Sequence, residues 1–137
     1  LDSADQEYYE KEVKPYIDGE QIQFLGEVDL AGKNELLKNA KASLTWLNRP
    51  EPFGLAYVES MACGTPVLIN PIGSPREIIE DGKTGFLVNT LDEMKQKIDE
   101  VSSLSPQDCR DRVTALFSKE KMVSDYIVIA QKLTTLL

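Results

Sequence analysis

Two glutamates, Glu51 and Glu59, lie eight positions apart in a segment that is predicted to pass from a loop into a short helix. The prolines that flank Glu51 disfavour helical dihedral angles, whereas Gly54 lets the backbone turn without a Cβ clash. The helix is therefore predicted to begin near Leu55. Gly64 is predicted to end it, because glycine commonly follows the last helical residue. The two carboxylates then stand on either side of the helix start.

The start of this helix could bind an anion. N–H groups in the first turn have no partner within a helix and form a natural anion site. Helical side chains lean toward the N-terminus, so Glu59 is expected to point at the opening that Glu51 enters from the loop. Two acceptors beside a phosphate-sized set of donors suit a ligand with phosphate in its middle and hydroxyls at both ends. A nucleotide sugar has this layout.

A simpler interpretation assigns neither glutamate to a ligand. Glu51 would be a solvated loop acid, and Glu59 would interact favourably with the helix dipole. Leu55, Val58, Glu59 and Ala62 follow the spacing of one helix face, so a carboxylate occupies one position of an otherwise apolar stripe. Spacing alone leaves both interpretations open.

The elements around this segment alternate between strands and helices. Strands are predicted at 21–26, 42–47, 65–70 and 85–88, and helices at 2–17, 33–40, 76–80, 91–102, from 106 onward, and 119–136. This alternation with short connections is typical of an α/β fold, a Rossmann-like parallel sheet with helices on both faces. Right-handed crossovers then bring the C-terminal ends of all strands to one edge, where ligands bind.

Two further loops are expected at that edge. Gly26, Glu27 and Val28 follow the first predicted strand. Gly73 and Ser74 precede a short helix, so their backbone could offer a second set of donors to a phosphate or sugar. The alternative, which capping preferences favour, is an ordinary N-cap at Ser74 with proline at the first helical position.

Composition argues against several classes of function. The formal net charge of −8 disfavours non-specific binding to nucleic acid or to an anionic membrane. The absence of histidine excludes a Ser-His or Cys-His nucleophile in this chain and disfavours a zinc site, although a carboxylate-only metal site is still compatible with the sequence. Neither G-x-G-x-x-G nor a P-loop is present, so a dehydrogenase or an NTPase has no support. We expect no metal and no cofactor.

The segment from Glu51 to Val67 resembles the E-x7-E motif of the family-4 (group 1) retaining glycosyltransferases. The resemblance rests on Glu51-Pro52-Phe53-Gly54-Leu55, on Glu59, and on Met61-Ala62-Cys63-Gly64-Thr65-Pro66-Val67. Similar blocks before and after this motif extend it over nearly the whole chain. Because that family has the GT-B fold, the resemblance implies the C-terminal, donor-binding half of a GT-B protein.

The resemblance implies a role for each matching residue. Glu51 would act in the catalytic site by accepting hydrogen bonds from the donor sugar, and Glu59 would accept them from the ribose diol. Backbone groups would bind the rest of the donor: Phe53, Gly54 and Leu55 at the diphosphate or sugar, and Gly26, Glu27 and Val28 at the base. The reaction would be a hexosyl-type transfer with retention, aided by stabilised charge on the departing diphosphate. Glu59→Ala should then weaken nucleotide binding, whereas Tyr57→Ala should not.

The sequence also departs from the family. Residues 1–20 lack the Arg and Lys of the R-x4-K-type segment that neutralises the diphosphate, and Arg49 and Arg76 are the nearby cations that could substitute. Ser60 stands where alanine is usual. The family's N-terminal acceptor domain is missing, and the chain begins without methionine, as expected for a domain excised from a larger protein. We therefore expect the isolated chain to fold but not to turn over.

Residues 1–137 are interpreted as a single nucleotide-sugar-binding domain of a cytoplasmic enzyme of carbohydrate biosynthesis, with no strong membrane signal. The apolar stripe of the last helix, about 118–136, would dock on the missing N-terminal domain or cover the sheet of its own domain. Two alternatives stay open: a non-catalytic Rossmann-like binding module, and a GT-B epimerase or phosphorylase. The acceptor, the base and the sugar of the donor are left unassigned.

Overall fold

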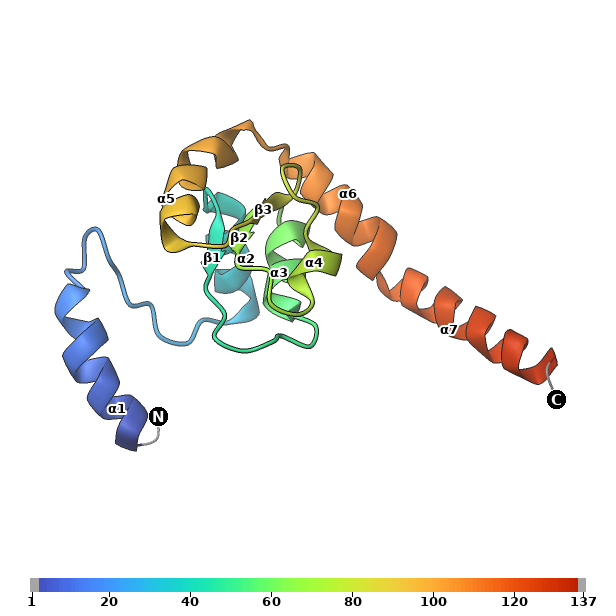
Figure 1. Ribbon diagram of the computed structural model, residues 1–137, viewed down its shortest axis with the longest axis horizontal. Helices are drawn as coiled ribbons and strands as arrows, with labels where there is room; N and C mark the ends of the chain where they lie inside the picture. Colours follow the sequence, from blue (N-terminus) through green and yellow to red (C-terminus); the bar gives the residue numbers. More distant parts are fainter. Residues whose placement is uncertain (1–2, 136–137) are drawn as a thin grey trace. The chain divides into compact units, whose positions relative to one another are not determined.

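The computed structural model describes residues 3–135 (Figure 1). Its contacts divide the chain into two compact units, one ending at Gly32 and the other beginning at Lys33. The second unit contains the sheet and most of the helices. It therefore contains the elements that position Glu51 and Glu59.

The first unit begins with the predicted N-terminal helix. The helix is present as three consecutive segments: α1 (Ser3–Tyr8), a π-helical turn (Tyr9–Val13) and a 3-10 turn (Lys14–Tyr16). Tyr9 packs against Phe24, with their ring centroids 5.8 Å apart. The side chains described in this unit are almost all exposed, so the unit has no core of its own.

Residues 21–26 do not form a strand, so this prediction is wrong. Asp18 instead accepts hydrogen bonds at Oδ1 from the N–H groups of Glu20, Gln21 and Ile22, at 2.8, 2.8 and 2.9 Å. This turn takes donors that a strand would need for its ladder, and no described strand pairs with the segment. The alternation of residue types was compatible with a strand, but a strand also needs a neighbour. Gly26, Glu27 and Val28 consequently lie in an exposed loop that does not follow a strand.

The second unit is built on a parallel sheet of three strands in the order β1-β2-β3. The strands are β1 (Ser43–Thr45), β2 (Val67–Ile69) and β3 (Gly85–Leu87). In register, Ser43 is opposite Val67, which is opposite Gly85. Each strand is shorter than predicted, but their order and direction confirm the parallel sheet and bring their C-terminal ends to one edge.

Helices cover both faces of this sheet (Figure 1). α3 (Leu55–Ala62), α4 (Pro75–Ile78) and α6 (Pro106–Phe117) pack on one face, and α5 (Leu91–Glu100) with a 3-10 turn at Val101–Ser103 packs on the other. The chain also forms α2 (Leu30–Asn39) and α7 (Lys119–Thr135), neither of which has a buried side chain among the described residues. Two predicted helix starts are confirmed by capping. Thr90 accepts from the Glu93 N–H at 3.1 Å, and Ser105 accepts from the Asp108 N–H at 3.4 Å.

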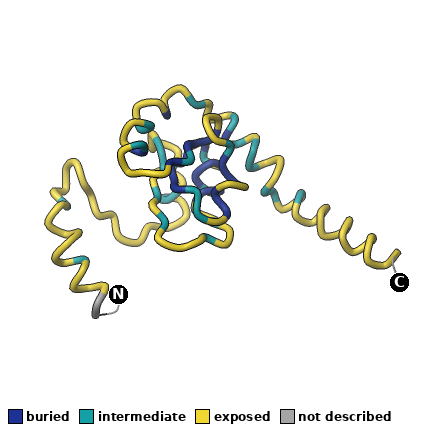
Figure 2. Tube along the Cα trace, viewed as in Figure 1, coloured by how far each residue is buried: buried dark blue, intermediate teal, exposed yellow. Residues whose placement is uncertain are grey.

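The core consists of two layers of buried side chains on opposite faces of β2. The buried residues gather around the sheet (Figure 2). Val67 and Ile69 face α3, α4 and α6, whereas Leu68 faces the layer formed by β3 and α5. This division follows from the alternation of side chains along a strand. All three residues of β2 are fully buried, as expected for the central strand of a parallel sheet covered on both faces. The predicted α/β class is thereby confirmed.

The last helix, α7, has no buried side chain between Lys119 and Thr135. Tyr126, Leu133 and their apolar neighbours are more than two-fifths exposed. The alternative in which this stripe covers the sheet of its own domain is therefore wrong for the described residues. None of the helices within residues 3–135 is both long and apolar enough to span a bilayer.

Cys109 on α6 belongs to the core layer beneath α3. Its thiol is fully buried and lies 3.6 Å from the Thr84 carbonyl oxygen. Burial, assisted by the charge of Asp108, raises the pKa of Cys109 to about 11. Cys63 is also a free thiol but is only partly buried.

These environments predict selective alkylation. At pH 8 about one Cys109 thiol in a thousand would be ionised, and the reagent could reach it only after local opening. Iodoacetamide should therefore label Cys63 first in the native chain and label both cysteines in denaturant, as measured by mass spectrometry of the peptides. Equal labelling rates without denaturant would contradict the buried position of Cys109.

Candidate functional site

The loop that carries Glu51 is fastened to the loop that follows β2. The Glu51 N–H donates to the Ile72 carbonyl oxygen at 3.2 Å, and the Glu51 carbonyl oxygen accepts from the Ser74 N–H at 3.0 Å. The Ser74 hydroxyl donates to the Phe53 carbonyl oxygen at 2.7 Å. Main-chain pairing on both sides of Glu51 fixes where its side chain leaves the backbone.

Asn70 makes a second connection between the same loops, nearer the sheet. Its amide donates to the Leu47 carbonyl oxygen at 2.9 Å and accepts from the Leu47 N–H at 2.6 Å. Asn70 directly follows β2 and is only 4% exposed. The sequence analysis did not assign this residue a role, although a buried asparagine at the C-terminal end of a central strand was a usable signal.

Gly73 allows the two loops to approach this closely. It has a φ of +85°, and a Cβ at this position would lie 2.5 Å from the Glu51 carbonyl oxygen and 2.8 Å from the Glu51 nitrogen. Any side chain would push the Glu51 backbone away. Glycine at this position is therefore needed for contact between backbones.

Ser74 does not cap α4 in the predicted way. Its side chain makes no capping hydrogen bond but donates to Phe53, and its N–H is engaged by Glu51. The second set of ligand donors expected at Gly73 and Ser74 is thus partly used to hold the Glu51 loop. Proline at the first position of α4 is confirmed.

The start of α3 has the geometry that the sequence predicted. The helix begins at Leu55, preceded by Gly54 with a φ of +86°. A Cβ on Gly54 would lie 2.3 Å from the Tyr57 ring. The Phe53 N–H points at Glu51 Oε1, 3.4 Å away, whereas the N–H groups of Gly54 and Leu55 donate to no acceptor among the described residues. Unpaired donors therefore lie beside the Glu51 carboxylate.

The buried face of α3 differs from the predicted stripe. Tyr57, Val58, Ser60 and Met61 are buried, whereas Leu55 is 66% exposed. The helix packs through Tyr57 and Met61, which are one turn apart, onto β2 and α6. Leu55 and Glu59 therefore lie outside the core, on the side of the helix that a ligand could reach.

Tyr57 is unsuitable as the neutral control that the sequence suggested. It is only 4% exposed and belongs to the core. Burial raises the pKa of its phenol, and the charge of Glu51 raises this pKa further, so the two side chains are near each other. Tyr57→Ala would leave a cavity beneath the loop rather than change a bystander.

Glu59 forms an ion pair that the sequence analysis missed. Its Oε1 atom accepts from the Lys33 ammonium at 2.9 Å, and the two side chains are 43% and 35% exposed. Lys33 comes from α2, 26 positions earlier in the chain. The sequence offered one signal for this contact: Lys33 lies one helical turn before the apolar Leu37 in a predicted helix.

The surroundings of Ser60, Arg49 and Arg76, which the sequence analysis singled out, are visible in the structure. The buried Ser60 hydroxyl donates to the Thr65 carbonyl oxygen at 3.0 Å, so this polar group is satisfied where alanine is usual. Arg49 and Arg76 are exposed and make no ion pair with the described residues.

The structure thus brings together Glu51, Phe53, Gly54, Gly73 and Ser74, with Leu55 and Glu59 following on α3. Gly26, Glu27 and Val28 belong to the other unit. Within residues 3–135, no group of three or more acidic, histidine or cysteine side chains is placed to hold a metal ion.

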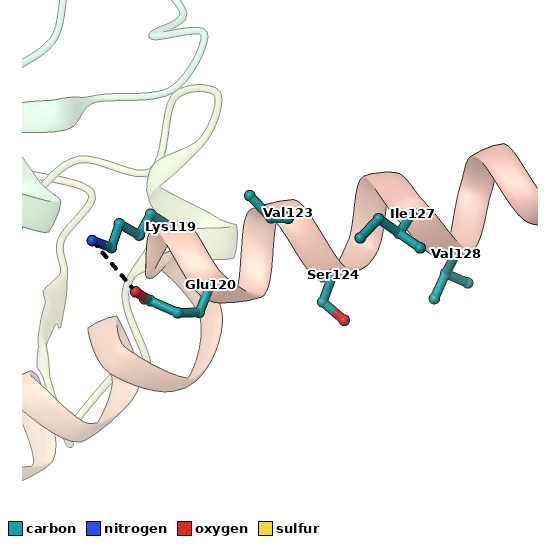
Figure 3. A pocket seen from close by; sticks show the side chains of 6 residues that line it. All are labelled: Lys119, Glu120, Val123, Ser124, Ile127 and Val128. Carbon is teal, nitrogen blue, oxygen red and sulfur yellow. Dashed lines mark ion pairs between the residues drawn. The ribbon is translucent and has the colours of Figure 1, made fainter.

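The hollows in the surface do not define this site. One of about 520 Å³ is lined only by α7 side chains, which Figure 3 shows projecting from a single helix. Another, of about 350 Å³, lies between Phe53 and the α6–α7 junction, where Phe53 meets Phe117 edge-on at 6.0 Å. The groups that could bind a ligand are instead the open donors and carboxylates at the start of α3.

Comparison with known proteins yields a family, relatives and similar structures. Residues 2–115 match the family described as glycosyl transferases group 1. The phosphatidyl-myo-inositol mannosyltransferase of Mycobacterium leprae is 32% identical over 114 residues, which cover 83% of this chain and 30% of the relative.

Two solved structures share the fold. Sucrose-phosphate synthase from Thermosynechococcus elongatus matches with a TM-score of 0.70 and 26% identity, over 98% of this chain and 35% of the synthase. HepE of Anabaena, solved in complex with UDP, matches with a TM-score of 0.64 and 23% identity, over 96% of this chain and 36% of HepE. The chain therefore spans about a third of the length of these proteins. With its parallel sheet and its match over residues 2–115, the chain belongs to the group 1 glycosyl transferases, a family of GT-B fold.

Proposed function

We propose that the chain binds the nucleotide-sugar donor of a retaining glycosyltransferase at the start of α3. The observation that carries this proposal is that the N–H groups of Gly54 and Leu55, beside the Glu51 carboxylate, have no acceptor within residues 3–135. An N-terminal helix turn with open donors favours a phosphate group. Glu59 follows one turn later, with a carboxylate that solvent can reach.

In this proposal each group at the site would bind one part of the donor. The diphosphate would meet the N–H groups of Gly54 and Leu55. Glu51 would accept hydrogen bonds from the sugar, and Glu59 would accept them from the ribose diol. The fixed backbone around Glu51 supports this assignment, because a group that orients a sugar must itself be held in place.

Backbone donors would bear most of the phosphate charge in this chain. The net charge of −8 provides no broad cationic surface, and the exposed Arg49 and Arg76 are the cations available near the loops. The same donors would stabilise the charge that develops on the diphosphate as the sugar departs. HepE, which shares the fold, was solved with UDP, so UDP is the first nucleotide to test.

The complete reaction would need a second domain. The chain spans about a third of its relatives' length, and we propose that the remainder supplies the acceptor-binding half of the GT-B fold. The exposed apolar side chains of α7 would dock on that half. The isolated chain would then bind the donor without transferring the sugar.

Glu59→Gln tests the assignment to the ribose. The substitution keeps the shape of the side chain but removes the charge that strengthens its hydrogen bonds. It should weaken nucleotide binding by about 1.5–3 kcal/mol, or roughly tenfold to a hundredfold. Calorimetric titration of UDP, GDP and ADP into both forms measures the loss and identifies the base.

Glu35→Gln is the matched control, because Glu35 is also a helical acid paired with a lysine but lies on the exposed part of α2. It should bind the nucleotide like the unsubstituted chain. Equal losses from both substitutions would indicate a general electrostatic effect. Tight binding that is insensitive to Glu59→Gln would refute the ribose assignment.

Gly73→Ala tests whether the loop contact positions Glu51. Its Cβ would meet the Glu51 backbone, whereas Gly82→Ala places alanine at a similar φ of +74° with no atom within 4 Å. Both should cost about 1–2 kcal/mol through left-handed strain. Gly73→Ala should cost about 1–3 kcal/mol more through overpacking.

Urea denaturation measures the difference in unfolding free energy between the variants. Calorimetry measures nucleotide affinity without urea, at a temperature where both variants are folded. Gly73→Ala should also weaken binding, whereas Gly82→Ala should not. If the two variants match in stability and in affinity, the close approach of the loops is not what fixes Glu51.

A further inference from the structure

Lys33 occupies an unusual place for a lysine on α2. From Lys33 to the end of the helix, only Lys33 and Leu37 are partly buried, and the other residues are exposed. They are four positions apart, so they share the face that turns toward the rest of the unit. Lys38, by comparison, is exposed and pairs with Glu35 on its own helix at 3.7 Å. The Lys33 ammonium is thus directed inward, to Glu59 on α3.

Hydrogen bonds through Thr65 fix the two helices relative to each other. The Thr65 hydroxyl donates to the Leu37 carbonyl oxygen of α2. The Thr65 N–H donates to the Ser60 carbonyl oxygen, and the Ser60 hydroxyl donates to the Thr65 carbonyl oxygen, each at 3.0 Å. Leu37 is one turn from Lys33, and Ser60 is adjacent to Glu59. The 2.9 Å ion pair is therefore held by a framework outside the pair itself.

The ion pair uses only part of the carboxylate. Lys33 donates to Oε1, and Oε2 has no donor among the described residues. A carboxylate offers about four lone-pair directions, so acceptor capacity is left for hydroxyl groups. A glutamate on the outer side of a helix would otherwise sample several rotamers and lose that freedom on binding.

We propose that Lys33 is a positioning residue that holds the Glu59 carboxylate ready to accept hydrogen bonds from the two hydroxyls of a ribose. This inference rests on the proposed donor function and concerns the same site. The lysine does not need to touch the ligand. It selects the rotamer of Glu59, so its effect should depend on the presence of the diol.

Lys33→Met and Lys33→Arg, with Lys38→Met as the matched control, test this role in the full 137-residue chain. The probes are UDP, GDP and ADP and their 2′-deoxy counterparts, titrated by calorimetry. Lys33→Met should weaken binding of the ribonucleotide by about three- to tenfold through lost pre-organisation. It should have a smaller effect on the 2′-deoxynucleotide, which gives Glu59 only one hydroxyl. Lys33→Arg should restore most of the difference, and Lys38→Met should change neither affinity.

Ligand-free relaxation measurements on the Glu59 side chain give an independent readout. The Glu59 Cγ methylene should be more mobile on the nanosecond timescale in Lys33→Met than in the unsubstituted chain or in Lys38→Met. An equally ordered Glu59 in Lys33→Met would overturn the proposal, whether or not a nucleotide binds.

The outcomes separate the two proposals. Nucleotide binding that depends on Glu59 but is unchanged in Lys33→Met would refute only the positioning role. A strengthened affinity in Lys33→Met would refute it as well, because the lysine would then compete with the diol. An equal loss of ribonucleotide and 2′-deoxynucleotide binding would also refute it. Nucleotide binding that ignores both Glu59 and Lys33 would refute the donor assignment itself.

Discussion

The structure around the candidate site depends on the close approach of two backbones, Gly73 and Glu51. This contact is possible only because Gly73 lacks a Cβ and adopts a positive φ. It lets main-chain hydrogen bonds form on both sides of Glu51, and Asn70 repeats the arrangement nearer the sheet. A loop that would otherwise move is thereby attached to the end of the central strand. The most buried element of the molecule thus determines the position of an exposed carboxylate.

Much of this architecture could be predicted from the sequence, because it is encoded locally. Glycines and prolines mark the start and end of α3, and Thr90 and Ser105 mark two later helix starts. The parallel order of the strands follows from the alternation of strands and helices. The strand predicted at 21–26 failed for a reason that is not local. Its pattern was suitable, but Asp18 took its N–H donors and no described strand lies beside it.

At the candidate site, the start of α3 was predicted from the sequence, whereas the tertiary contacts were missed. Gly54 and the first turn of α3 follow from residue types near one another in the sequence. The bridge from Ser74 to Phe53 and the ion pair from Lys33 to Glu59 join positions 21 and 26 residues apart. Nothing in either short segment specifies its partner. Such contacts become visible only when the sheet has brought the loops and α2 together.

The misassigned face of α3 illustrates why a helix at a candidate binding site can mislead a periodicity argument. The predicted stripe placed Glu59 among apolar residues, yet the helix buries Tyr57 and Met61 and leaves Leu55 and Glu59 outside. A carboxylate inside the core would have required desolvation and a permanent partner. Outside the core, Glu59 keeps unused acceptor capacity while Lys33 restricts its orientation. Partial exposure with a single ionic contact therefore suits the role proposed for Glu59, in which it accepts hydrogen bonds from ligand hydroxyls, better than either full burial or full freedom.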